Sequence, residues 1–377
     1  MTPIQIGSCT LYHGDALAIL PLLEPASVQL IVCDPPYYKV KMDYAGESLA
    51  WDRQWPTVTA YLDWLHTLAI AWQRVLAPNG SLYCFASPQM AAQAELTLGQ
   101  TFAVLNHLVW RKHNGTGTGT GGHSKASKES LRAFFPQTER ILFCEQRNAD
   151  STALGVSGYA AQCAQLRGFV FEPIRAYLEG ERRRAGIARE AVNTACGTAS
   201  MAARHYFSTS QWCLPTAPHY AAMQALFNRE GRQPAPPFAD YHPSGSPFAR
   251  LHTAPGDEYL RADYEALRAD YEALRRPFTV SAAIPYTDVW DFATVPAGPG
   301  KHPCEKPLPL LRHIIQASSR PGDVVLDCCA GSGSTLDAAR QCGRQAIGIE
   351  QDAVWIRAIQ TRLAQEELFP LTTTEDA

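Results

Sequence analysis

A four-residue segment near the start of the chain, Asp34-Pro35-Pro36-Tyr37, combines groups that can hold an exocyclic amine of an aromatic base. The carboxylate of Asp34 can accept one hydrogen bond from an NH2 group. The carbonyl of Pro35 can accept a second, because proline carries no competing N–H and stiffens the turn. Two such acceptors direct the nitrogen lone pair at an incoming electrophile, and the Tyr37 ring offers a stacking surface for a base removed from its helix. Taken alone, the tetrapeptide also fits a proline turn with an N-cap aspartate.

A glycine-rich segment near the end of the chain has the composition of a cofactor loop. The buried run at 324–327 ends at Asp327, and Gly331-Ser332-Gly333 makes the turn into a helix. Glycines in such a turn let the backbone pass close to a bound ligand. Glu350 ends the next predicted strand, where an acid can hold both hydroxyls of a ribose. The dinucleotide fingerprint would need a third glycine where Leu336 stands, so an oxidoreductase is disfavoured.

The elements predicted around these two motifs alternate along the chain. Strands are expected at 28–33, 81–85, 102–110, 140–144, 323–327 and 346–350, and helices at 61–76, 307–317, 335–341 and 354–368. This alternation implies an α/β fold with a mostly parallel sheet covered by helices on both faces. Ligands bind beyond the carboxyl ends of the strands in such sheets, and both motifs fall there. We therefore expect the two motifs to be neighbours on adjacent strands.

The region from about 151 to 297 differs, because proline, arginine and histidine become frequent and strand patterns fade. A helix is expected at 173–184. Two more helices are expected at 188–195 and 199–207, joined by Cys196-Gly197-Thr198. They fit either a helix-turn-helix with Arg204 and His205 on its second helix, or a plain helical hairpin.

A heptad repeat follows at 261–274. Five apolar or aromatic residues step by four, three, four and three along one face of the predicted helix: Leu260, Tyr264, Leu267, Tyr271 and Leu274. Two heptads are too few for an independent coiled coil. The seam must therefore dock on this chain or on a second copy of it.

Basic side chains gather in two parts of a chain whose net charge is −3. Lys125 and Lys128 follow the segment at 115–122, which holds only glycine and threonine and is expected to be a mobile loop. Arg182, Arg183 and Arg184 stand together on the predicted helix at 173–184. These residues are either phosphate contacts or parts of solvated faces.

Length and composition describe an ordinary soluble globular protein. The 377 residues are 46% hydrophobic and 18% charged, enough for about two domains. We find no apolar run of the ~20 residues that a membrane span needs, and no secretion signal at the N-terminus. Eleven cysteines without a C-x-x-C pair predict reduced thiols in the cytoplasm, with no disulfide framework and no zinc or other metal site.

With both motifs in view, the chain resembles the beta-class DNA amino-methyltransferases over roughly residues 9–147 and 298–365. Four further segments match that family in order: 14–17, 75–83, 138–143 and 302–307. The resemblance implies a Rossmann-like methyltransferase fold, with a mixed sheet that is mostly parallel and has one antiparallel strand. It divides the chain into a catalytic half at 1–150, a mainly helical target-recognition insert at 151–297 and a cofactor half at 298–377.

The resemblance also implies roles for single residues. Asp34 and the Pro35 carbonyl hold the target amine in the turn stiffened by Pro36, and Tyr37 stacks on the base. The cofactor is S-adenosylmethionine, with the methionine part at the glycine loop, the ribose at Glu350, the adenine near Asp15 and the carboxylate near His302 and Lys306. The full cofactor set is Asp15, Asp34, His302, Lys306, Asp327, Ala330, Gly331, Ser332, Gly333, Ser334 and Glu350. Cys328 and Cys329 replace the proline and the phenylalanine that the family usually has in this loop.

An aspartate at the head of the tetrapeptide favours N6 of adenine in this family, whereas serine there favours N4 of cytosine. The nitrogen would attack the methyl carbon directly, with no covalent enzyme intermediate. We expect a homodimer on duplex DNA, contacted by Lys125, Lys128, Arg182, Arg183, Arg184, Arg204 and His205. The alternatives are N4-cytosine methylation, a non-catalytic DNA-binding regulator, and methylation of RNA or of a protein glutamine.

Overall fold

The computed structural model of the chain describes residues 2–38, 50–113, 134, 137–146, 172–208, 212–231, 259–260, 263–274, 276–279, 287–296, 298 and 301–367. The chain forms two compact units, one of residues 1–147 with 277–377 and one of residues 148–276. Among the described residues, the first unit holds all the strands and the second holds only helices. The predicted Lys125 and Lys128 contacts and the segment at 115–122 lie outside the described residues.

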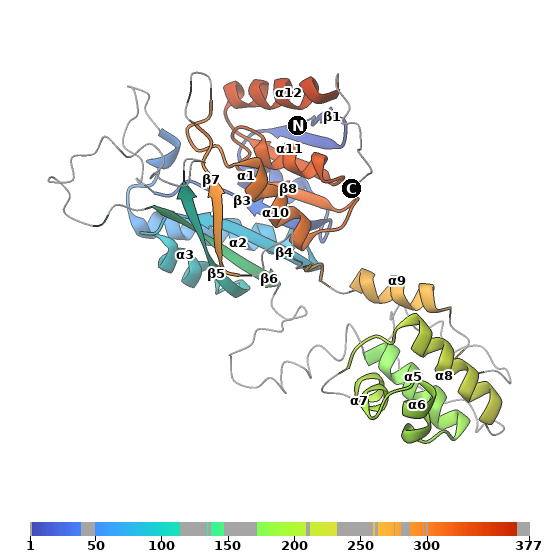
Figure 1. The fold of residues 1–377 in the computed structure, drawn as a ribbon. Helices are drawn as coiled ribbons and strands as arrows, with labels where there is room; N and C mark the ends of the chain where they lie inside the picture. Colours follow the sequence, from blue (N-terminus) through green and yellow to red (C-terminus); the bar gives the residue numbers. More distant parts are fainter. Residues whose placement is uncertain are drawn as a thin grey trace. The chain divides into compact units, whose positions relative to one another are not determined.

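The described strands of the first unit form one sheet in the order β1-β2-β9-β8-β3-β4-β6-β5-β7 (Figure 1). The strands are β1 (Ile4–Ile6), β2 (Cys9–His13), β3 (Val28–Cys33), β4 (Leu76–Ala86), β5 (Phe102–His113), β6 (Thr138–Gln146), β7 (Val289–Ala293), β8 (Val324–Asp327) and β9 (Gln345–Glu350). The mostly parallel sheet is confirmed, and β6 runs antiparallel to both of its neighbours. The predicted number of antiparallel strands, one, is too small, because the edge strand β1 also pairs antiparallel with β2.

Helices cover both faces of this sheet. Leu30 and Val32 of β3 pack into the core beneath α10 (Leu308–Ser318), α11 (Ser334–Gln341) and α12 (Ala353–Glu367). Ile31 and Cys33 of the same strand pack into the opposite core, with α1 (Ala16–Ile19), α2 (Val58–Val75) and α3 (Ala91–Leu98). A strand buried on both faces reads as a continuous apolar run, which is why the sequence signal for β3 is strong. Short 3-10 helices lie at Leu20–Leu22 and Ala50–Asp52.

The boundary of the insert differs from the prediction. Residues up to 297 were assigned to the recognition insert, but β7 pairs in parallel with β5, with Val289 opposite Val109. Trp290 is buried in the core of the sheet, and Thr279 already donates a backbone hydrogen bond to Ala317 of α10 (2.7 Å). The first unit therefore resumes at Pro277. A five-residue edge strand in which Val289 is half exposed carries little periodic signal.

The second unit packs its helices around its own core. They are α5 (Glu172–Ala185), α6 (Arg189–Ala195), α7 (Met201–Phe207), α8 (Ala217–Glu230) and α9 (Tyr264–Leu274). The turn between α6 and α7 contains Gly197 at φ +64°. Leu260 and Leu267 of the heptad seam are buried in this core, and Tyr264 and Tyr271 pack against it. Of the two predicted partners for the seam, the structure therefore shows docking on the same chain.

Candidate active site

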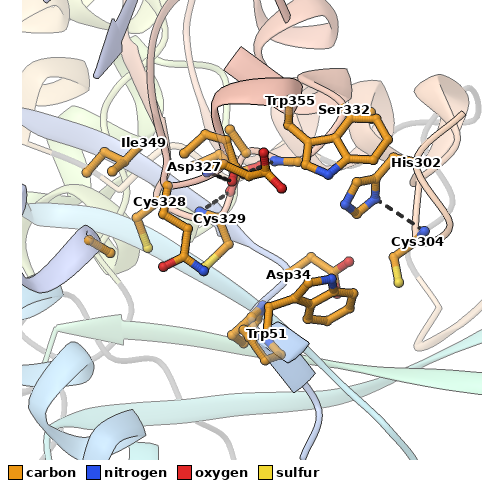
Figure 2. A pocket seen from close by; sticks show the side chains of 18 of the residues that line it. Asp34, Trp51, His302, Cys304, Asp327, Cys328, Cys329, Ser332, Ile349 and Trp355 are labelled. Atoms are coloured by element: carbon orange, nitrogen blue, oxygen red, sulfur yellow. Dashed lines mark hydrogen bonds between the residues drawn. The ribbon is translucent and has the colours of Figure 1, made fainter. Parts of the chain in front are cut away.

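The two motifs leave the same edge of the sheet from neighbouring strands. β3 and β8 run in parallel, with Leu30 opposite Val325 and Ile31 opposite Leu326. The predicted adjacency of the tetrapeptide and the glycine loop is confirmed. Both motifs line a cavity of about 730 Å³ at this edge, formed by residues of the first unit (Figure 2). This is the place where open α/β sheets bind their ligands.

Both oxygens of the Asp34 carboxylate have partners in the cavity. The ammonium group of Lys306 forms an ion pair with Oδ2, and the hydroxyl of Tyr37 donates a hydrogen bond to Oδ1. Burial raises the pKa of the Asp34 carboxyl, and the ammonium of Lys306 only partly offsets this rise. Burial lowers the pKa of Lys306, but Asp34 and Glu139 outweigh it and hold that pKa above its usual range. The resemblance placed Lys306 at the carboxylate end of the cofactor, whereas the structure places its ammonium on the carboxylate of Asp34.

A second carboxylate, which the prediction left out of the site, completes this ionic cluster. Glu139 of β6 lies with Oε2 3.5 Å from the Lys306 ammonium, and its Oε1 is paired with Lys112 of β5. The side chains of Glu139 and Lys306 are 12% and 8% exposed, so these charges neutralise one another with little help from water. The sequence carried a signal, because Glu139 lies in one of the segments that match the family.

Tyr37, for which only a stacking role is predicted, is also fixed by hydrogen bonds to three carboxylates. Its hydroxyl lies 3.4 Å from Glu139 Oε2 in addition to its bond with Asp34, and its backbone N–H donates to Oδ1 of the buried Asp52 (2.7 Å). Burial and the two carboxylates raise the pKa of Tyr37 well above its usual range, so the phenol remains a donor. The Lys306 ammonium lies over the ring, 5.5 Å from its centroid.

The glycine loop is shaped at two positions that exclude a side chain. Gly331 has φ +48°, and a Cβ there would lie 3.2 Å from the ring of His302. Gly333 has φ +76°, and a Cβ there would lie 2.9 Å from Ile359 of α12. Gly333 therefore allows the turn to pack against α12, and it does not belong to the cavity lining. The lining does include Asp327, Ala330, Gly331, Ser332 and Ser334, as predicted for the cofactor loop.

Glu350 ties the loop to the end of β9. Its Oε2 accepts a hydrogen bond from the Gly331 N–H and its Oε1 from the Asp352 N–H, each at 2.8 Å. Each carboxylate oxygen has further lone pairs, so the same group can accept ribose hydroxyls from the cavity side. Burial raises the pKa of Glu350. A narrow glycine cradle beside a carboxylate at a strand end fits the methionine and ribose parts of S-adenosylmethionine.

An aromatic wall stands beside this cradle. The ring of His302 packs edge-on against Trp355 of α12 at a centroid distance of 4.5 Å, and Trp51 lies stacked on its other side at 6.4 Å. The His302 ring also accepts a hydrogen bond from the Cys304 N–H (3.2 Å). Figure 2 shows His302 and Trp355 across the cavity from Cys328 and Cys329. The prediction found His302 but missed both tryptophans, because neither lies in a motif with fixed spacing.

Asp15 lines the cavity and also caps α1. Its Oδ1 accepts hydrogen bonds from Leu17 N–H (2.9 Å) and Ala18 N–H (3.2 Å). The predicted adenine contact therefore shares its carboxylate with a helix N-terminus.

The two cysteines that replace the family's proline and phenylalanine point to different surroundings. Cys328 is buried in the core, and the indole N–H of Trp72 donates to its sulfur (3.2 Å). Cys329 is half-buried and lines the cavity with its neighbour. Burial opposes ionisation of Cys328, but hydrogen bonds from Cys329, Cys33 and Trp72 hold its pKa well below the usual thiol range.

The predicted DNA contacts of the second unit fall into two groups. Arg182 pairs with Glu179 (2.8 Å) and Arg184 with Glu181 (2.9 Å), and both side chains are less than one-fifth exposed. Both ion pairs lie within α5, and the phosphate contacts proposed for Arg182 and Arg184 remain predictions. Arg183 is 61% exposed although it also reaches Glu179 (2.9 Å). Arg204 is exposed on α7, and His205 beside it is half-buried.

Comparison with known proteins agrees with this geometry. A DNA methylase family model matches residues 28–361. The DNA adenine methyltransferase YhdJ of Escherichia coli (strain K12) is 24% identical over 94% of this chain and 82% of its own length. The type II methyltransferase M2.DpnII of Streptococcus pneumoniae is 22% identical over 94% of this chain and 90% of its own.

A solved structure also matches along most of its length. It is described as a DNA modification methylase from Thermus thermophilus, complexed with S-adenosyl-L-methionine. It is 18% identical, covers 94% of this chain and 93% of that one, and has a TM-score of 0.45.

Among the described residues, no helix is long and apolar enough to cross a membrane. The family match over most of the chain, together with the tetrapeptide and the glycine loop on adjacent strands, shows that this protein belongs to the DNA methylase family, as a DNA amino-methyltransferase that uses S-adenosylmethionine.

Proposed function

We propose that this enzyme transfers a methyl group from S-adenosylmethionine to N6 of an adenine in duplex DNA, in the cytoplasm. One observation carries the proposal: Asp34 and the glycine loop at Gly331 line one cavity from adjacent strands. The cavity therefore holds both a carboxylate that can accept hydrogen bonds from an amine and a glycine cradle that can hold a methyl donor. The aspartate at the head of the tetrapeptide supports adenine, as does the name of the Escherichia coli relative.

The residues of the tetrapeptide would position the amine. Asp34 accepts one N6–H and the Pro35 carbonyl accepts the other, which turns the nitrogen lone pair toward the cofactor. The Tyr37 hydroxyl can release Oδ1 of Asp34 to the amine, because its second contact, Glu139, is close enough to receive it (3.4 Å). Lys306 keeps the carboxylate oriented while this exchange takes place.

When bound, S-adenosylmethionine supplies an electrophilic methyl carbon on a sulfonium centre. As the nitrogen attacks, positive charge develops on the amine, and the Asp34 carboxylate stabilises that charge and takes up a proton. Catalysis then rests on positioning and on a fixed electrostatic environment. No protein nucleophile is required.

The target base must leave the duplex to reach this cavity. We propose that it stacks on the face of the Tyr37 ring away from Lys306, because the ammonium lies over the other face. His302, Trp355 and Glu350 would then enclose the nucleoside part of the cofactor, with Asp15 toward its adenine.

The helical unit is proposed to recognise the DNA sequence. Its α6-turn-α7 segment buries Tyr206 and Phe207 and leaves Arg204 exposed, as a recognition helix would. Arg204 would contact a base edge, His205 and Arg183 the phosphates. Lys125 and Lys128 remain proposed phosphate contacts on the basis of sequence.

We also propose that the enzyme is a homodimer, as the family habit suggests. The heptad seam no longer supports this assignment, because Leu260 and Leu267 are buried within their own unit. Light scattering at micromolar concentrations tests it, and a monomer at every concentration would refute it.

Labelled methyl transfer tests the activity. Purified enzyme with methyl-labelled cofactor should label duplex DNA, and it should label neither RNA nor protein. Digestion of the DNA to nucleosides should then place the label in N6-methyladenine. Label in N4-methylcytosine would refute the adenine assignment, and no transfer to any substrate would favour a non-catalytic DNA-binding protein.

A further inference from the structure

Three thiols meet at the edge of the cofactor cavity. Cys33 ends β3, and Cys328 and Cys329 follow directly after β8. Their sulfur atoms all lie within 4.8 Å of one another, and the sulfurs of Cys33 and Cys328 are 3.5 Å apart. The chain positions of these two residues differ by 295, so no local sequence spacing announces the cluster.

The sulfur separations match those of a thiolate-bound metal ion. A zinc–sulfur bond of about 2.3 Å places two thiolates of a tetrahedral site about 3.8 Å apart. The Cys33–Cys328 separation of 3.5 Å lies near this value, and the other two separations exceed it by at most about 1 Å, so three sulfurs can reach one ion with side-chain adjustment. A disulfide would instead require two sulfurs to close to about 2.05 Å.

The surroundings also suit a soft metal ion. Cys33 and Cys328 are buried, and Cys329 is half-buried. Cys328 and Cys329 also line the cavity, which gives an ion a path to the cluster. The indole N–H of Trp72 donates to the Cys328 sulfur at 3.2 Å. An outer hydrogen bond of this kind orients a metal-bound ligand. Cysteines that serve only as small apolar core residues would need neither access to the cavity nor a hydrogen bond from an indole N–H such as that of Trp72.

We propose that Cys33, Cys328 and Cys329 form a binding site for one thiophilic metal ion, such as Zn²⁺ or Cd²⁺. The three thiolates supply three ligands, and the fourth position opens toward the cavity. Thiolate ligands select such soft ions over Mg²⁺ or Ca²⁺. A bound ion links the end of β3, before Asp34, to the end of β8, after Asp327. The inference does not depend on the methyl transfer proposed above.

Cadmium titration of the full-length reduced protein, without cofactor, tests this site. Thiolate-to-cadmium charge-transfer absorption should saturate at one ion per chain, and the bound ion should raise the melting temperature. Loss of an outer-shell partner alone costs about 10–100-fold in metal affinity, so Cys33→Ser or Cys329→Ser should weaken binding by at least about 100-fold. Cys329 is half-buried, and its serine variant keeps the test valid if Cys33→Ser does not fold.

Two control variants separate this site from other thiols. Cys144→Ala removes a buried thiol from the same core, and Cys304→Ser removes another thiol of the cavity lining. Both should bind one Cd²⁺ with the affinity of the wild type. Absence of stoichiometric binding by the wild type would overturn the proposal. Wild-type affinity for Cd²⁺ in Cys329→Ser would overturn it as well. Loss of Cd²⁺ binding in either control would also overturn it, because the ion would then depend on a thiol outside the cluster.

Discussion

The ammonium group of Lys306 forms an ion pair with the carboxylate of Asp34, although 272 positions separate the two residues. Glu139 lies 3.5 Å from the same ammonium, and Lys112 balances Glu139 from the neighbouring strand. The segment at 302–306, whose His302 packs against Gly331 of the glycine loop, thus also sets the electrostatics of the Asp34 carboxylate. Asp34 is part of a four-charge cluster drawn from both halves of the catalytic unit.

Lys306→Met should shift the acid limb of the pH–rate profile to higher pH. Asp34 accepts the amine only when it is ionised, so activity falls as its protonated form accumulates with decreasing pH. Burial already raises the pKa of Asp34, and loss of the opposing ammonium raises it further. An opposite charge at this range shifts a carboxyl pKa by about 1–3 units, so the limb should move by at least about one pH unit. The rate is measured against pH at saturating cofactor.

Lys301→Met is the matched control, because Lys301 is exposed and lies five residues earlier in the chain. Its acid limb should coincide with that of the wild type. A coincident limb in Lys306→Met would show that this ion pair does not control Asp34.

Asp34→Asn and Glu350→Gln should separate chemistry from cofactor binding. Loss of a charged acceptor aimed at the developing positive charge should lower the methyl-transfer rate of Asp34→Asn on the order of 10²–10³-fold. Glu350 accepts from Gly331 and Asp352, so its neutral variant should weaken cofactor binding by about 10–100-fold. Calorimetric titration with cofactor and single-turnover rates at saturating cofactor distinguish the two effects. The same defect in both variants would argue against separate roles.

Arg183→Ala and Arg182→Ala should differ although the residues are neighbours on α5. Arg183 is 61% exposed, so its variant should weaken duplex binding and reduce the salt slope of log Kd by about 1. Arg182 is 14% exposed and pairs with the buried Glu179, so its variant should lose about 2–3 kcal/mol of unfolding free energy. Fluorescence anisotropy at several salt concentrations and urea unfolding measure the two quantities. A loss of stability in Arg183→Ala with unchanged DNA binding would contradict this division.

Asp327→Asn should flatten the pH dependence of stability. Burial raises the pKa of Asp327 to about 7, so the folded protein binds this proton more tightly than the unfolded chain. The resulting stability is complete below the unfolded pKa of about 3.9 and is lost as pH rises through about 7. Between about pH 5 and pH 8 the wild type should lose about 2–3 kcal/mol more unfolding free energy than the variant.

Asparagine keeps a side-chain oxygen that can accept from the Cys329 N–H (3.0 Å) or from Thr335, two hydrogen-bond partners of Asp327. Urea unfolding across this pH range, in the presence of a chelator, measures the difference. Parallel stability curves for the two proteins would refute the assignment.

The framework of the site follows from local patterns in the sequence. The continuous apolar run of β3 and the glycine turn after β8 each identify a buried strand with a motif at its end. Their adjacency follows from the rule that ligands bind at the carboxyl edge of a parallel sheet. The edge strands β1 and β7 have short, half-exposed segments and give little periodic signal, so one antiparallel pairing and the boundary at Pro277 were missed.

The side-chain constellations depend on contacts between distant segments, which spacing does not encode. Lys306 with Asp34, and Cys33 with Cys328, come together only through strand order. The ion pair of Arg182 is an exception, because Glu179 stands three residues earlier, at ion-pair distance on a helix, and sequence spacing alone predicts it. The heptad seam allowed two partners, and only the packing of Leu267 into its own unit decides between them.

The most direct test of the central claim is base-modification sequencing of DNA from cells that carry the wild-type chain or Asp34→Ala. The geometry of Asp34 and the glycine loop predicts N6-methyladenine in one sequence context in wild-type cells and its disappearance in the variant. Adenine methylation that persists in Asp34→Ala, or N4-methylcytosine in place of N6-methyladenine, would contradict the account.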